Sequence, residues 1–146
     1  MIFYLGSSES LPIIERIDTV PSIHTTVIGK DDEGIRLHIN QPFIVYIGTE
    51  EGCGCKFRHS LLDGTEWLEV TDDDKEYIEL EQQYQQLLFE YIKGNVSKNK
   101  NVEVYGCWDG NLSEPKKFES EITLEEMLQK NFYFKEQGLY KIKIGG

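Results

Sequence analysis

The chain has 146 residues, a length typical of one domain, so we expect a single globular domain over residues 1–146. Its formal net charge of −11 disfavours binding to nucleic acid or to an anionic membrane, which requires a basic face. The longest apolar runs fall well short of the ~20 residues that span a bilayer. The N-terminal residues lack the basic and long apolar regions of a secretory signal, and three cysteines do not make a disulfide framework, so we expect a cytoplasmic protein.

The first forty residues predict strands separated by irregular chain. Residues 2–5 (IFYL) form a short apolar strand, and the proline-containing residues 11–22 are irregular. Residues 23–39 predict a β-hairpin, because two alternating runs flank a turn-rich middle. The most even pairing places His24 opposite His38 on the hairpin's exposed face. Two imidazoles are too few ligands for a metal site, so we expect surface histidines there.

The middle of the chain predicts a buried strand and a long helix. Residues 41–48 (QPFIVYIG) are apolar at odd and even positions, as in a strand that is buried on both faces. Between about residues 72 and 93, apolar residues recur at spacings of three and four, which predicts a long amphipathic helix. Acidic residues in its first turn and Lys93-Gly94 at its end suit the two helix termini.

The last third predicts two more strands and a short helix. Residues 101–108 (NVEVYGCW) follow the long helix as a strand. A capping box, Thr123-x-x-Glu126, opens a second short helix over about residues 123–131. Residues 138–144 alternate in polarity and predict an edge strand with one wet face. The predicted fold class is therefore α+β, a mostly antiparallel β-sheet with one long amphipathic helix packed on it.

The segment EGCGCKFRH, residues 51–59, is the stretch most suggestive of chemistry. In an extended chain the side chains of Cys53 and Cys55 point the same way. If Cys107 approaches from another strand, His59 completes a Cys₃His zinc site. The usual spacing of zinc ligands, with two pairs of close cysteines or histidines, is missing. Zinc is thus the alternative to our expectation that the protein binds no cofactor.

The same sulfurs allow three other interpretations. Lys56 and Arg58 would stabilise a thiolate, which suits a thiol-redox pair or the nucleophile of a cysteine hydrolase. Free cysteines are also among the most buried residues, so Cys53 and Cys55 can share a packed face with Phe57. We favour packing, with the flanking glycines allowing a turn or a close backbone approach.

The negative charge is concentrated in one region. Residues 63–81 contain nine acidic residues and one lysine, while the signs balance between residues 98 and 143. The sequence motifs of nucleotide-binding loops, serine hydrolases and zinc proteases are absent. We therefore expect binding, not catalysis: a small protein-binding module, of the inhibitor or immunity type, that meets a basic partner protein through an acidic surface. The residues that we expect at this surface are Glu66, Glu69, Asp72 and Asp73.

Overall fold

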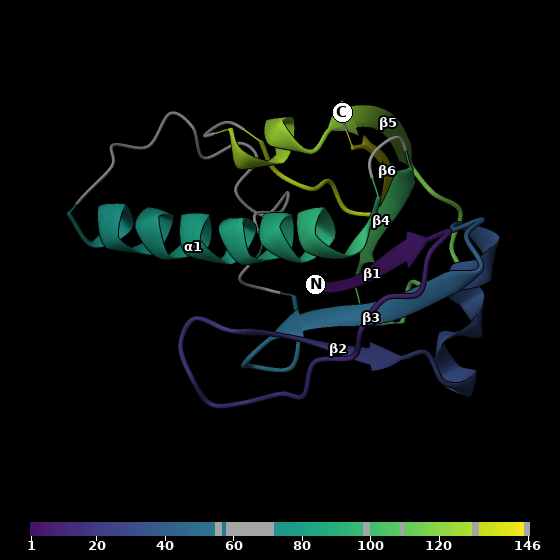
Figure 1. Cartoon of the computed structure of the whole chain (residues 1–146), viewed down its shortest axis with the longest axis horizontal. Helices are drawn as coiled ribbons and strands as arrows, with labels where there is room; N and C mark the ends of the chain where they lie inside the picture. The colour runs from purple at the N-terminus through teal and green to yellow at the C-terminus, as the bar shows by residue number, and fades with distance from the viewer. Residues whose placement is uncertain (55–56, 58–71, 98–99, 109, 130–131, 145–146) are drawn as a thin grey trace.

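The protein folds into one mostly antiparallel sheet with a long helix across one face (Figure 1). The computed structural model describes residues 1–54, 57, 72–97, 100–108, 110–129 and 132–144, with the backbone alone for residues 72–78. The predicted α+β fold class is confirmed. Within the described part of the chain, no helix is both long and apolar enough to cross a membrane.

The described strands form a six-stranded sheet in the order β2-β3-β1-β4-β6-β5. Neighbouring strands are antiparallel except for the parallel pair β5 and β6. The strands are β1 (Ile2–Ser7), β2 (Ile23–Val27), β3 (Phe43–Thr49), β4 (Asn101–Cys107), β5 (Phe118–Thr123) and β6 (Gly138–Lys143). The predicted strands at residues 2–5, 41–48 and 101–108 are confirmed as β1, β3 and β4, at the centre of the sheet.

Alternation along the central strands divides the core into two clusters. Phe3 and Leu5 of β1 belong to the larger cluster beneath the helix, whereas Tyr4 belongs to a smaller cluster on the opposite face. The 3-10 helix η1 (Lys30–Leu37) contributes to this smaller cluster through Ile35. Helices α1 (Asp72–Asn95) and η3 (Glu125–Leu128) cover the first face. The second face is therefore covered by a much shorter element, which leaves room for a pocket.

Helix α1 confirms the predicted long helix, beginning at residue 72 as expected and ending two residues later than expected. Its predicted apolar stripe faces the core where the side chains are described. Tyr84, Leu88 and Ile92 are at most 1% exposed, and Leu80 and Leu87 pack partly buried against the same cluster. The buried Gln85 side chain donates to the Met127 carbonyl at 3.0 Å and so ties α1 to η3. The helix is thus held by apolar packing and by polar contacts to its neighbour.

Element η3 stands where the second short helix was predicted. The Glu126 amide donates to the Thr123 hydroxyl at 3.3 Å, the contact expected of the capping box. The element is a single 3-10 segment of four residues, shorter than the predicted 123–131. Leu124 and Met127 anchor it in the core.

The predicted hairpin over residues 23–39 is wrong in its second half. Residues 23–27 form β2, but β2 pairs with β3, and residues 30–37 form η1. The Asp32 carboxylate accepts the Gly29 amide at 2.9 Å and closes the first turn of η1. Ile35 and Ile39, one helical spacing apart, are then buried on the sheet. The capping contact of Asp32 and the helical spacing of Ile35 and Ile39 therefore decide the structure here, and the alternating polarity of the sequence does not produce a second strand.

The two histidines of that segment do not meet, and both are buried instead of exposed. The ring Nδ1 of His24 lies 2.9 Å from the Thr49 carbonyl, and Nε2 of His38 lies 2.8 Å from the Leu112 carbonyl. Since a carbonyl only accepts, each of these ring nitrogens carries the proton. The histidines therefore act as buried structural donors.

The predicted edge position of residues 138–144 is also wrong, because β6 lies between β4 and β5. Its predicted alternation holds from Tyr140 onward, where Tyr140 and Ile142 are buried while Lys141 is half-buried and Lys143 exposed, but Leu139 on the predicted wet face is buried as well. The strand at this edge of the sheet is β5, which pairs with β6 in parallel and whose sequence FESEIT also alternates in polarity.

Helix α1 gives a direct test of the larger core cluster. Leu88→Ala removes a side chain that is 1% exposed, so we expect the free energy of unfolding to fall by ~2–5 kcal/mol. Leu37→Ala removes the same atoms where the side chain is 72% exposed, so we expect a change within ~0.5 kcal/mol. Urea unfolding followed by circular dichroism measures both, and equal losses would contradict the assignment of the core.

Candidate functional site

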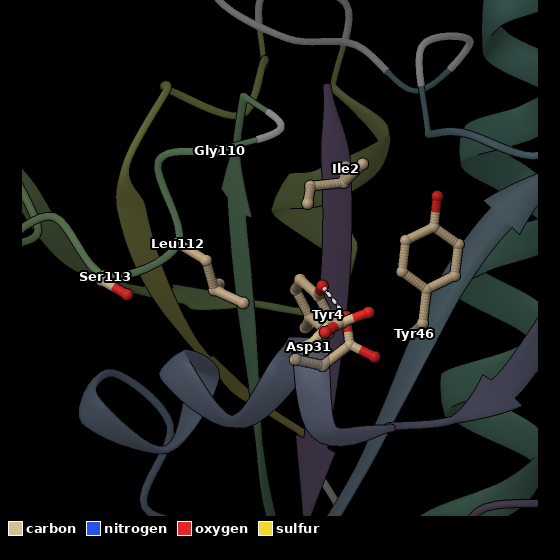
Figure 2. Close-up of a pocket in the computed structure, with 8 residues that line it drawn as sticks. Ile2, Tyr4, Asp31, Tyr46, Gly110, Leu112 and Ser113 are labelled. Carbon is tan, nitrogen blue, oxygen red and sulfur yellow. Dashed lines mark hydrogen bonds between the residues drawn. The ribbon is translucent and has the colours of Figure 1, made fainter.

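A pocket of about 430 Å³ opens on the face of the sheet opposite α1 (Figure 2). Residues from β1, β3, η1 and the loop after β4 converge on it, although these segments are far apart in the sequence. Its volume lies within the ~300–1,000 Å³ typical of ligand sites. The described residues that line it are Ile2, Tyr4, Asp31, Asp32, Tyr46, Gly110, Leu112 and Ser113.

Two tyrosines from neighbouring strands form the aromatic part of the pocket. The register of β1 and β3 places Tyr4 directly opposite Tyr46, so both side chains stand on the same face. Their rings meet nearly edge to face, with centroids 5.5 Å apart and an angle of 80° between the planes. The Tyr46 hydroxyl donates to the Gly52 carbonyl at 2.6 Å, which fixes the half-buried ring at the pocket's side.

Helix η1 supplies the acidic part of the pocket. The Tyr4 hydroxyl donates to Asp32 Oδ1 at 2.6 Å, while Asp32 Oδ2 accepts the Gly29 amide. Burial, together with this hydrogen bond, raises the pKa of Tyr4 well above the usual value for tyrosine. Tyr4 therefore stays a protonated donor at neutral pH and keeps Asp32 oriented. The neighbouring Asp31 is exposed.

The loop after β4 forms the third wall, and it is tethered on both sides. The Asn111 amide donates to the Trp108 carbonyl at 3.0 Å across a turn in which Gly110 has a φ of 91°. At Leu112 the carbonyl accepts the proton of His38 Nε2. The His38 ring in turn stacks on Tyr105, with centroids 4.2 Å apart and planes within 11°. The apolar side chain of Leu112 is thereby held at the pocket.

The lining is rich in hydrogen-bond acceptors and poor in cations. Asp31 and Asp32 provide carboxylates, and none of the described lining residues is a lysine or an arginine. The tyrosines and the apolar side chains of Ile2 and Leu112 surround these acids. Such a lining suits a ligand that carries positive charge next to an apolar part.

The described residues that directly follow β3, residues 50–54, form a turn, as the glycine pattern predicted. The Thr49 amide donates to the Cys53 carbonyl at 2.8 Å, and Gly52 has a φ of 94°. A Cβ on Gly54 would lie 2.2 Å from the Phe3 ring, so this position needs glycine. Phe57 is fully buried and packs edge-on against the same ring, which confirms its place in the core.

The described cysteines have different states. Cys53 is half-buried and disulfide-bonded, so the prediction that it is a free core thiol is wrong. Cys107 is not disulfide-bonded and is buried at the end of β4 opposite Ile2. Cys55 and His59 lie outside the described residues, and the Cys₃His zinc set stays a prediction. Among the residues that are described, no three His, Cys, Asp or Glu side chains form a metal-binding group.

The predicted partner-binding residues are largely outside the described structure. Glu66 and Glu69 belong to the undescribed segment before α1, and Asp72 and Asp73 begin α1 in a part whose backbone alone is described. Their role stays a prediction. The structure instead places Asp31 and Asp32 in the lining of the pocket, whereas the predicted hairpin places them in a turn.

Comparisons of the chain with protein-family models, with curated proteins and with solved structures find no match.

Two matched substitutions test the contact at the base of the pocket. Tyr4→Phe removes the donor to Asp32, so we expect the free energy of unfolding to fall by ~1–3 kcal/mol at pH 7. Tyr105→Phe removes a hydroxyl that is buried without a hydrogen-bond partner in the described structure, so we expect a gain of ~1 kcal/mol. Both residues belong to the same core cluster, and chemical denaturation that gives both changes the same sign would contradict these assignments.

Proposed function

We propose that this chain is a non-catalytic protein-binding module, of the inhibitor or immunity type, which recognises a basic partner protein through acidic surface. The observation that carries the proposal is the pocket, where Asp31 and Asp32 lie beside two tyrosines in a chain of net charge −11. A negative field of this kind speeds the encounter with a basic partner and favours its orientation.

The surface next to η1 supports the proposal by its composition. Val27, Leu37 and Phe43 are 74%, 72% and 45% exposed, and they lie at the end of β2, in η1 and at the start of β3. Exposed apolar side chains beside acidic ones are typical of interaction surfaces, where an apolar centre is bordered by charge. η1 itself combines Leu37 with the acids of its first turn.

The alternative function is that of a zinc-binding or thiol-redox protein that uses Cys53, Cys55 and Cys107. The disulfide at Cys53 favours the redox form of this alternative. Elemental analysis and thiol counting in denaturant, with and without reductant and chelator, test it. Bound zinc at one equivalent, or a disulfide that opens and closes near cytoplasmic redox potentials, would support the alternative over the binding module.

Selection from a phage-displayed library of random peptides tests the proposed function even though the partner is unidentified. We expect the selected peptides to be rich in arginine and lysine, because the carboxylates supply the attraction. Raising the salt concentration from about 50 to about 300 mM should weaken their binding about tenfold, since salt screens exposed charges.

Charge reversal provides the second arm of that experiment. Replacing all four of Glu66, Glu69, Asp72 and Asp73 by lysine should weaken the binding of the selected peptides about tenfold or more, because this region is expected to steer the partner. Neutral or acidic selected peptides, or binding that is independent of salt and of this reversal, would contradict the proposed function.

A further inference from the structure

We propose that the pocket between η1, β1 and β3 receives an arginine side chain of the basic partner. This inference rests on the proposed function and assigns to its partner the residue that is recognised. The pocket is lined by aliphatic side chains, by aromatic rings and by carboxylates. These match three features of an arginine side chain: its apolar stem, its flat cationic group and its fork of N–H donors.

The apolar and aromatic walls suit the stem and the plane of the guanidinium. Ile2 and Leu112 offer aliphatic surface, and the half-buried ring of Tyr46 stands on the opposite side of the pocket from Leu112 (Figure 2). A guanidinium is weakly hydrated and packs against aromatic rings, whereas an ammonium group keeps its water more strongly. These walls therefore favour arginine over lysine.

The acidic residues of the lining provide hydrogen-bond acceptors. Asp32 uses one lone pair of each oxygen for Tyr4 and Gly29, and a carboxylate has about four such sites. The Asp31 side chain is exposed and makes no hydrogen bond or ion pair to the rest of the described chain, so its oxygens are open to a donor. Two carboxylates on consecutive residues can share the five N–H groups of one guanidinium.

The walls are already held in place before any ligand arrives. Three hydrogen bonds, from Tyr4 to Asp32, from Tyr46 to Gly52 and from His38 to Leu112, fix one wall each at 2.6, 2.6 and 2.8 Å. Because binding then requires little ordering of the pocket, more of the interaction energy is available for affinity. A single exposed acidic residue elsewhere on the surface is not surrounded by walls that are fixed in advance.

Short capped peptides with one central arginine, lysine or citrulline, flanked by glycines, test the inference by titration calorimetry and by amide chemical-shift mapping. We expect the arginine peptide to bind and to shift amides of η1, β1 and β3. The lysine peptide should bind about tenfold more weakly, because its ammonium does not stack or fork. The neutral citrulline peptide should show no measurable binding, since it keeps the shape and loses the charge.

The decisive variant is Asp31→Asn, because this side chain is exposed and its replacement leaves the contacts of Asp32 intact. It should weaken the binding of the arginine peptide at least about fivefold, because a charge-assisted hydrogen bond loses its charged acceptor. Glu125→Gln is the matched control: it changes the net charge equally, at an exposed position of η3 on the other face of the sheet, and should change affinity less than about twofold.

Three results would overturn the inference: equal effects of the two variants, citrulline binding as well as arginine, or free arginine binding about tenfold more tightly than the peptide, which would indicate a small-molecule site. If the selected basic peptides bind wild-type protein in a salt-sensitive way but shift no amide around the pocket, the proposed function survives and this inference fails. If no basic peptide binds at all, both fail.

Discussion

The hydrogen bond from Tyr4 to Asp32 is the contact on which the rest of this face of the molecule depends. Tyr4 stands on β1, in the middle of the sheet, and is only 1% exposed. Its hydroxyl is too deeply buried to be left unpaired without a cost of ~1–3 kcal/mol. Asp32 meets that need and, with its other oxygen, closes the first turn of η1. One carboxylate thus both shapes η1 and holds it to the sheet.

This constraint also explains why the two faces of the sheet differ. The long helix α1 buries one face in a continuous apolar cluster that includes Leu5 and Ile142. On the other face η1 is short and is attached through Asp32 and Ile35, so Tyr4 is covered but Tyr46 stays half-buried. The gap that remains is the pocket, and its acidic side follows from the residues that η1 needs for its own first turn.

Much of the fold was predictable because its signals are periodic. Helix α1 followed from apolar spacing, and β3 from its run of apolar residues on both faces. The features that differ from prediction depend on contacts between distant residues. The spacing of Ile35 and Ile39 and the acids after Gly29 were visible signals for η1, but the alternation of residues 23–39 outweighed them. The sequence of β5 also carries a period-two signal, although a weak one.

The candidate site was less predictable for the same reason. No motif joins Tyr4, Asp32 and Tyr46, since strand order and register alone bring them together. EGCGCKFRH is the more conspicuous segment because its cysteines, glycines and basic residues are locally distinctive. In the described structure the first part of that segment forms a turn, and its Gly52 carbonyl positions Tyr46 at the pocket. Its contribution to the site is therefore made by the backbone.

A double-mutant cycle between Tyr4 and Asp32 tests most directly whether this contact organises the face. The free energy of unfolding is measured for wild type, Tyr4→Phe, Asp32→Asn and the double variant. If the hydroxyl and the carboxylate depend on each other, the cycle should give a coupling of ~1–2 kcal/mol. Single effects that add within ~0.3–0.5 kcal/mol would show that the two side chains act independently and would contradict this account.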